Sequence, residues 1–258
     1  MPISLPASSP EGATPPDPDR QLADTVLVQS AWFQAISDDL RAWLNANSRI
    51  VRRAAGERLF MRGDPDDGLY CVLDGLIRVG AASFAGKEAL LAVIEPVNWF
   101  GEITLFDGGE RTHDAYAERD SVLFHTPRAA LTTLLAERPD YWRAFGLLLT
   151  GKLRLAFAAI EEAALLPAAQ RVARRVLLMA GGLDDGFRHV AAGADAAPKR
   201  RVIKVPQEDL AMMLALSRQT INQILRQFEL QGALALRYGE IEIVDVDKLI
   251  ALAAPGGA

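Results

Sequence analysis

The segment VPQEDLAMMLALSRQTINQILRQFELQGALALRYGEIEIVDV, residues 205–246, decides how the C-terminal part of this chain folds. Pro206 is tolerated at a helix start, and the acidic pair Glu208 and Asp209 suits the positive end of a helix dipole. After a short turn, Ser217 can cap a second helix, whose apolar residues recur at i, i+3, i+4 and i+7. The segment therefore predicts two helices joined by a tight turn.

The opposite side of the second helix is polar and carries no acid. It consists of Arg218, Gln219, Asn222, Gln223 and Arg226. Arginine matches guanine and glutamine matches adenine through paired hydrogen bonds, so this face suits base edges. Two strand-like runs around Gly239 follow as a small hairpin, called the wing below. This arrangement predicts a winged helix-turn-helix that binds double-stranded DNA, and the alternative is two amphipathic helices with hydrated polar faces.

A long apolar helix is predicted N-terminal to this unit, over residues 139–166. Apolar or small residues recur at spacings of three or four along positions 142, 145, 149, 153, 156, 160 and 163. This pattern favours a dimerisation helix that pairs with a second copy of the chain, and the alternative is a buried helix in a monomer. Pro167 ends the helix, a second helix follows to about Ala180, and residues 181–201 are expected to form a loop.

The sequence pattern of residues 49–124 is typical of a β domain. Short β-branched and aromatic runs are interrupted by glycine, mostly every 5–7 residues, which indicates an antiparallel sandwich or roll. Gly75 lies where a hairpin would reverse. Residues 22–47 have helical spacing, whereas residues 1–20 contain six prolines and are expected to be a disordered tail. The fold class is therefore α+β.

Composition restricts the function classes. The net charge of the 258 residues is −5, but residues 167–258 carry 12 Lys and Arg against 10 Asp and Glu, which is compatible with DNA binding. The single cysteine, Cys71, allows no disulfide within the chain and no iron–sulfur cluster. The chain shows no signal peptide, membrane span, P-loop, zinc-ligand spacing or Gly-x-Ser-x-Gly motif. We expect a cytoplasmic protein that is not an enzyme.

The stretch WFGEITLFDGGERTHDAYA, residues 99–117, places an acid after a glycine and an arginine beside a hydroxyl. Further motifs are Gly56-Glu57-x-Leu59-Phe60-x-x-Gly63-Asp64, Leu69-Tyr70-x-Val72-x-x-Gly75, Phe100-Gly101-Glu102-Ile103 and Ser217-Arg218-Gln219-Thr220. In this order they resemble the family of the cyclic-AMP receptor protein and FNR over residues 30–253. The resemblance implies a β-roll domain (21–138), a dimerisation helix (139–166) and a DNA-binding domain (167–258).

The resemblance also implies a site for a cyclic nucleotide, which would regulate DNA binding allosterically. Gly101 would bring its backbone amide to the ligand, Glu102 would accept from the ribose 2′-hydroxyl, and Arg111 and Thr112 would hold the cyclic phosphate. Arginine offers a planar fork for this purpose. Ser217 and Thr220 would join the DNA-contacting set, and RNA polymerase is an implied partner.

The predicted site departs from the family at its base-reading end. Cyclic-AMP binders carry two adjacent hydroxyl residues on the central helix, where this chain has Ala156 and Phe157. Cyclic AMP could still bind through its phosphate and ribose, and cyclic GMP is the other effector that we expect. Three alternatives stay open. One is a regulator of the same family without a nucleotide ligand, the second has a haem or redox input through residues such as Cys71 or His125, and the third is a nucleotide-binding adaptor that does not bind DNA.

Overall fold

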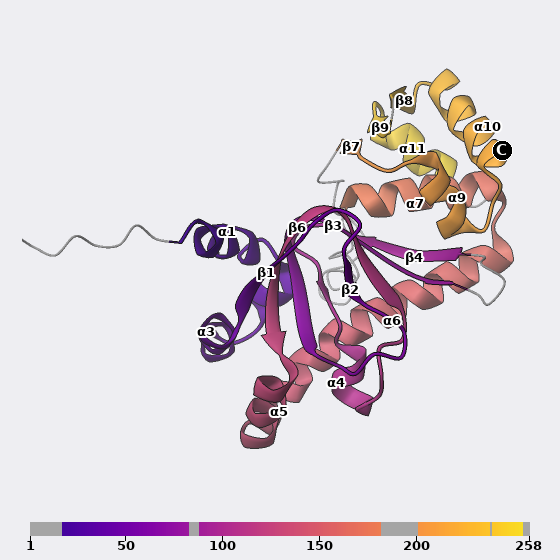
Figure 1. Ribbon diagram of the computed structural model, residues 1–258. Coiled ribbons are helices and arrows are strands. Elements are labelled where there is room, and N and C mark those ends of the chain that lie inside the picture. The colour runs from indigo at the N-terminus through magenta and orange to yellow at the C-terminus, as the bar shows by residue number, and fades with distance from the viewer. Residues whose placement is uncertain (1–16, 83–87, 182–200, 238, 255–258) are drawn as a thin grey trace, which may run out of the picture.

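A computed structural model of the chain describes residues 17–82, 88–181, 201–237 and 239–254. Three N-terminal helices, α1 (Pro18–Leu27), α2 (Ala31–Ala35) and α3 (Asp38–Asn47), pack beside a β domain (Figure 1). Asp17, Ser30 and Ser37 cap them through their side chains. The predicted tail of residues 1–20 is wrong for Pro18–Arg20, because the Asp17 cap lets α1 begin there. The rest of that prediction, residues 1–16, lies outside the described residues.

The β domain is an antiparallel six-stranded sheet that curls on itself. Its strands are β1 (Arg49–Arg53), β2 (Arg58–Phe60), β3 (Gly68–Ala82), β4 (Glu88–Ile94), β5 (Trp99–Phe100) and β6 (Asp114–Pro127). The long strand β6 pairs with β1, β2 and β3, and β3 also pairs with β4 and β5. The predicted α+β class is confirmed.

Gly75 does not reverse the chain, so the hairpin expected there is wrong. Strand β3 runs through it, and the register with β6 shifts on both sides of this point. Gly75 has φ +97°, and a Cβ added to it would lie 2.2 Å from the Ser121 hydroxyl oxygen. The glycine serves a β-bulge in place of a turn, because a bulge also uses positive φ.

The β domain continues into the central helix. Helices α4 (Ile103–Asp107) and α5 (Arg128–Glu137) and a 3₁₀ turn, η1 (Pro139–Tyr141), precede α6 (Trp142–Leu165). The first turns of α6 are anchored, because Phe145 is fully buried and the Trp32 indole N–H donates to the Ala144 carbonyl at 2.8 Å. The second half of α6 has exposed apolar side chains, namely those of Leu153, Phe157, Ile160 and Leu165.

The C-terminal unit follows α7 (Ala168–Gly181), and the predicted loop lies largely in residues 182–200, outside the described residues. The unit contains β7 (Val202–Ile203), α9 (Gln207–Leu214), α10 (Arg218–Leu230), β8 (Leu234–Arg237), β9 (Glu240–Ile243) and α11 (Val246–Ala253). Ala215, with φ +52°, makes the turn after α9, and the Ser217 hydroxyl accepts from the Thr220 amide at 3.0 Å. The strands form a three-stranded sheet in the order β7-β9-β8.

The C-terminal unit contacts the β domain through α9. Met212 and Met213 pack against Leu76, Leu90 and Val93 of β3 and β4. At the edge of this apolar contact, the Arg78 guanidinium donates to the Asp209 carboxylate at 2.9 Å, and that carboxylate side chain is only 5% exposed. Helix α9 is therefore held on the β domain, while α10 lies on the outer side of the unit (Figure 1).

Candidate functional site

Gly101 fixes the approach of two chain segments at one end of the β domain. It follows β5 with φ +95°, and a Cβ added here would lie 2.8 Å from both an Arg111 guanidinium nitrogen and the Gly68 carbonyl oxygen. Any larger residue would push the arginine away. Gly101, Glu102 and Arg111, together with Asp66 and Asp67 of the turn before β3, are called the Arg111 site below.

The Arg111 side chain is only 2% exposed, and its guanidinium is surrounded by acceptors. It donates to the Gly101 carbonyl at 3.0 Å, to the Gly68 carbonyl at 2.6 Å and to the Asp67 carboxylate. It also pairs with Asp66 at 3.1 Å. The Phe60 ring lies 4.4 Å from the guanidinium carbon, a cation–π distance. Both carboxylate partners of Arg111 thus come from the turn before β3.

Glu102 is buried at the N-terminal end of α4 and is paired with the central helix. Its carboxylate accepts from the Lys152 ammonium at 2.5 Å. Lys152 is one helical turn before Ala156 on α6. This ion pair therefore links the Arg111 site directly to the helix that leads to the C-terminal unit, and sequence reasoning missed it. Lys152 lies four residues before Ala156, a predicted ligand residue, so the helical spacing could have placed Lys152 on the same side of the helix.

The other predicted ligand residues, Thr112, Ala156 and Phe157, make no described contact with Arg111 or Glu102. Thr112 is exposed, and its hydroxyl lies 2.9 Å from the His113 imidazole. Ala156 is exposed and Phe157 is 62% exposed on α6, and among the contacts described for this chain none joins them to Arg111. The described contacts thus join Gly101 and Arg111 directly and tie Glu102 to α6, and they include none from Thr112, Ala156 or Phe157 to Arg111 or Glu102.

A polar network continues from the Arg111 site into the sheet. The Tyr70 hydroxyl donates to Asp67, and Tyr70 stacks on His125 with ring centroids 4.3 Å apart. One His125 nitrogen lies 3.0 Å from the Asp67 carbonyl oxygen, and the other accepts from Arg49 at 3.2 Å. Burial, which is the main cause, and the nearby Arg49 and Arg111 charges lower the pKa of His125. Burial likewise raises the pKa of Tyr70, so its hydroxyl stays protonated as a donor.

A haem or redox input would need His125 or Cys71 to be available. His125 is 2% exposed and uses both ring nitrogens in the network, and Cys71 is fully buried in β3. Buried thiols in apolar surroundings are inert. Within residues 17–82, 88–181, 201–237 and 239–254, no group of three or more His, Cys, Asp or Glu side chains is arranged to hold a metal ion.

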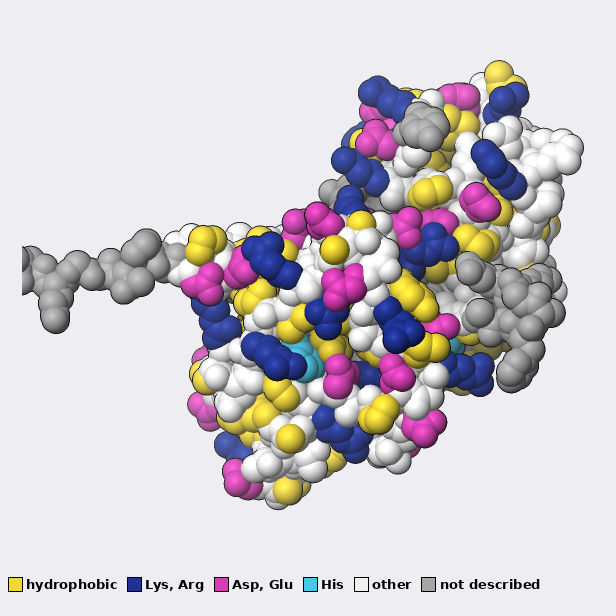
Figure 2. Space-filling view, in the orientation of Figure 1, with side chains coloured by type: hydrophobic (Ala, Val, Ile, Leu, Met, Phe, Trp, Pro, Cys, Tyr) yellow, Lys and Arg dark blue, Asp and Glu magenta, His cyan; other side chains and the backbone are white. Residues whose placement is uncertain are grey.

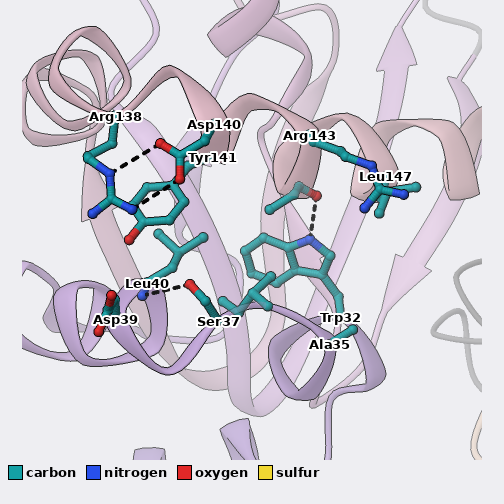
Figure 3. Close-up of a pocket in the computed structure, with 12 residues that line it drawn as sticks. Trp32, Ala35, Ser37, Asp39, Leu40, Arg138, Asp140, Tyr141, Arg143 and Leu147 are labelled. Atoms are coloured by element: carbon teal, nitrogen blue, oxygen red, sulfur yellow. Dashed lines mark hydrogen bonds and ion pairs between the residues drawn. The ribbon is translucent and has the colours of Figure 1, made fainter.

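A pocket of about 310 Å³ lies elsewhere, between α2–α3 and the start of α6 (Figure 3). Its floor includes Trp32 and Leu40, and an Arg138–Asp140 ion pair of 3.0 Å lies at its rim. The one polar group on the Trp32 side chain is already bonded to Ala144. Because the Trp32 indole and the Arg138–Asp140 pair already have partners in the protein, this pocket is a weaker candidate than the Arg111 site.

Over residues 218–226 helix α10 presents a polar face without an acid, and Glu229, near the end of the helix, accepts from the Leu236 amide at 2.9 Å. Arg218, Gln219, Gln223 and Arg226 are exposed, while Ile221, Ile224, Leu225 and Phe228 are buried on the other side. The Asn222 amide donates to Gln207 of α9 at 2.9 Å, and the Thr220 hydroxyl lies 2.8 Å from Ser217. Lys and Arg are otherwise interspersed with acids over the visible surface (Figure 2). Cationic groups for a polyanion on this helix thus come from Arg218 and Arg226.

A β roll with a buried glutamate and arginine, a long helix and a winged helix-turn-helix together define a DNA-binding protein with a candidate ligand site. The cyclic nucleotide-binding domain model matches residues 50–138, and the Crp-like helix-turn-helix domain model matches residues 170–252. The chain therefore belongs to the Crp/Fnr family of DNA-binding transcription regulators, as the sequence predicts.

Individual relatives agree with this assignment. The chain is 27% identical to the CRP-like cAMP-activated global transcriptional regulator of Mycobacterium tuberculosis, over 88% of this chain and 97% of that protein. It is 28% identical to the cyclic AMP receptor protein of Thermus thermophilus over 73% and 80% of the two chains. A solved CRP/FNR-family regulator from Thermus thermophilus superposes with a TM-score of 0.60 at 26% identity, over 80% of this chain and 98% of that chain.

Among the described residues, no helix is long and apolar enough to cross a membrane.

Proposed function

We propose that the Arg111 site binds a cyclic nucleotide and thereby controls DNA binding by α10. The observation that carries this proposal is the pairing of Glu102 with Lys152, because it joins the site to the helix that leads to the C-terminal unit. Relatives named for activation by cyclic AMP support it. Glu102 would accept from the ribose 2′-hydroxyl, Arg111 and Thr112 would hold the phosphate, and Gly101 would allow close backbone approach.

The base would lie toward α6, where Ala156 and Phe157 replace hydrogen-bonding side chains. Phe157 offers an aromatic face that covers a purine without distinguishing adenine from guanine by hydrogen bonds. We therefore propose cyclic AMP or cyclic GMP as effector, with the choice decided by direct comparison. The regulator acts in the cytoplasm as a homodimer joined through α6, recruits or blocks RNA polymerase, and catalyses no reaction.

Calorimetric titration with cyclic AMP and cyclic GMP tests the proposal. We expect at least one of them to bind, and we expect Arg111→Lys to weaken binding, since lysine keeps the charge but loses the planar fork. Arg143→Lys, an exposed arginine at the start of α6, is the matched control and should bind as wild type does. Absence of heat with both nucleotides would contradict the effector role.

A regulator without a nucleotide ligand is the second candidate, because Arg111 is already paired with two carboxylates. In that case the ion pairs of the Arg111 site would be structural. Arg111→Lys would then lower the melting temperature without affecting any ligand, and DNA binding would be unchanged by added nucleotide.

A further inference from the structure

The Arg111 guanidinium is in use before any ligand arrives. Arginine has five N–H donors, and here the four on the two terminal nitrogens go to the Gly101 and Gly68 carbonyls, to Asp67 and, at 3.5 Å, to the Thr104 hydroxyl. The remaining nitrogen, Nε, is buried without a hydrogen-bond partner. A phosphate that uses the terminal nitrogens must therefore displace a protein acceptor.

The charges of the Arg111 site are already balanced. Arg111 pairs with Asp66 and Asp67, and Arg128 pairs with the other oxygen of Asp66 at 2.6 Å. Two guanidinium groups thus face two carboxylates. A cyclic phosphate would add a third anion, and a buried charge without a partner is strongly unfavourable. If one carboxylate leaves, the remaining positive charge is matched by the phosphate.

The two carboxylates differ in their freedom to leave. The Asp66 side chain is 2% exposed and is held between Arg111 and Arg128. The Asp67 side chain is 46% exposed and is held by Arg111 and the Tyr70 hydroxyl. Rotation of Asp67 into solvent would free two donors, one on Arg111 and one on Tyr70, which both point to the place that its carboxylate occupies.

We propose that Asp67 is an internal anion that occupies the phosphate position and that sets ligand affinity by competing with the cyclic phosphate for Arg111. This inference rests on the proposed function, since it concerns the same ligand. It assigns Asp67 a role in selectivity: a nucleotide binds only when its phosphate competes successfully with this carboxylate. Charge-assisted hydrogen bonds are the strong ones, so the competition affects affinity substantially.

Calorimetric titration of Asp67→Asn and Asp67→Ala with cyclic AMP and cyclic GMP tests this role. We expect both variants to bind the effector about tenfold or more tightly than wild type, a factor that corresponds to about 1.4 kcal/mol. Glu110→Gln is the matched control: Glu110 is an exposed carboxylate one residue from Arg111, and its removal should leave affinity within about twofold. Adenosine and guanosine lack the phosphate, so they should bind the Asp67 variants no more tightly than they bind wild type.

Each outcome decides one point. Equal or weaker nucleotide binding by both Asp67 variants, with wild type binding normally, would overturn the competition while leaving the proposed function intact. Nucleotide binding by the Asp67 variants but not by wild type would support the competition, because Asp67 would then exclude the phosphate completely. No binding by any protein would overturn both the effector role and this inference. Melting curves without ligand identify any variant that fails to fold. If one of the two Asp67 variants does not fold, the other is used for the titration.

Discussion

At the scale of single residues, Arg111 and Glu102 are buried charges that owe their stability to partners from distant segments. Asp66 and Asp67 precede β3, and Lys152 is on α6. Removing one partner of a buried pair costs more than the pair contributes, because the remaining charge is left uncompensated. The same side chains therefore hold the end of the β roll together and place the groups that a nucleotide would use.

His125 predicts a pH dependence of stability. Its pKa is lowered in the fold, mainly by burial, whereas in the unfolded chain it takes up a proton near pH 6.5. As the pH falls below about 6.5, the unfolded state binds a proton that the folded state excludes, so stability falls by up to about 1.4 kcal/mol per pH unit. This loss continues until the pH reaches the lowered pKa of the folded state.

Urea unfolding of wild type and His125→Gln between pH 5 and 7.5 measures this effect, and the variant should show a shallower loss. His113→Gln is the comparison, because the pKa of the less buried His113 is also lowered and should account for a smaller part of the slope. Identical slopes for wild type and His125→Gln would contradict the assignment.

At the scale of elements, α10 and α6 have exposed faces that the single chain does not explain. The α10 face is polar with two arginines, and the α6 face is apolar. Exposed apolar residues in register along one helix indicate a protein partner, and a polar cationic face beside a wing indicates a nucleic acid. Each interpretation leads to its own experiment.

Arg218→Ala should weaken binding to a DNA duplex and relax the preference at one base pair, at a cost of about 1–3 kcal/mol. Fluorescence anisotropy with a duplex selected from a random pool is the measurement. Arg143→Ala removes the same charge from the start of α6, which is not part of the C-terminal unit, and should have no such effect. Unchanged affinity and preference in Arg218→Ala would show that α10 does not read the bases.

Ile160→Glu should convert the proposed α6 dimer to a monomer. Ile160 is 66% exposed in one chain and belongs to the predicted seam with Leu153 and Ala156, so a second copy would bury it. A charge in that position would be left without a partner. Light scattering after gel filtration gives the mass. Ala158→Glu, on the opposite side of the same helix, is the control and should stay dimeric, and a dimeric Ile160→Glu would place the interface elsewhere.

At the scale of the whole molecule, the C-terminal unit is held on the β domain by Arg78 and the methionines of α9. Burial is the main cause of the raised pKa of Asp209, and the charge of Arg78 opposes it. The contact therefore depends on an ion pair whose carboxylate is poorly solvated. It provides a second connection between the domains, in addition to α6.

Arg78→Ala should release the C-terminal unit, because Asp209 would then be a buried carboxylate with its closest cation removed. The expected result in X-ray scattering is a larger radius of gyration with unchanged helix content. Glu118→Gln removes the more exposed carboxylate beside Arg78, at 3.3 Å, and should leave the scattering unchanged. Unaltered scattering from Arg78→Ala would mean that the methionine contact is sufficient.

The sequence allowed the two helices of the C-terminal unit to be predicted, because their spacing, Ser217 cap and turn are local features. The sequence did not reveal the partners of Arg111. Asp66 and Asp67 belong to the segment GDPDDG, residues 63–68, whose composition is typical of a turn, and only the fold brings them to the arginine. Gly75 was misinterpreted for a related reason: positive φ serves a bulge as well as a hairpin, and only strand pairing distinguishes them.

The most direct test of the central claim is the affinity of the full chain for its selected duplex, with and without saturating effector. If the Arg111 site controls α10, the effector should change the dissociation constant at least about fivefold, the lower end of typical coupling. Arg111→Lys should lose this response while keeping its ligand-free DNA affinity. A bound effector that leaves the dissociation constant of wild type unchanged would contradict the account.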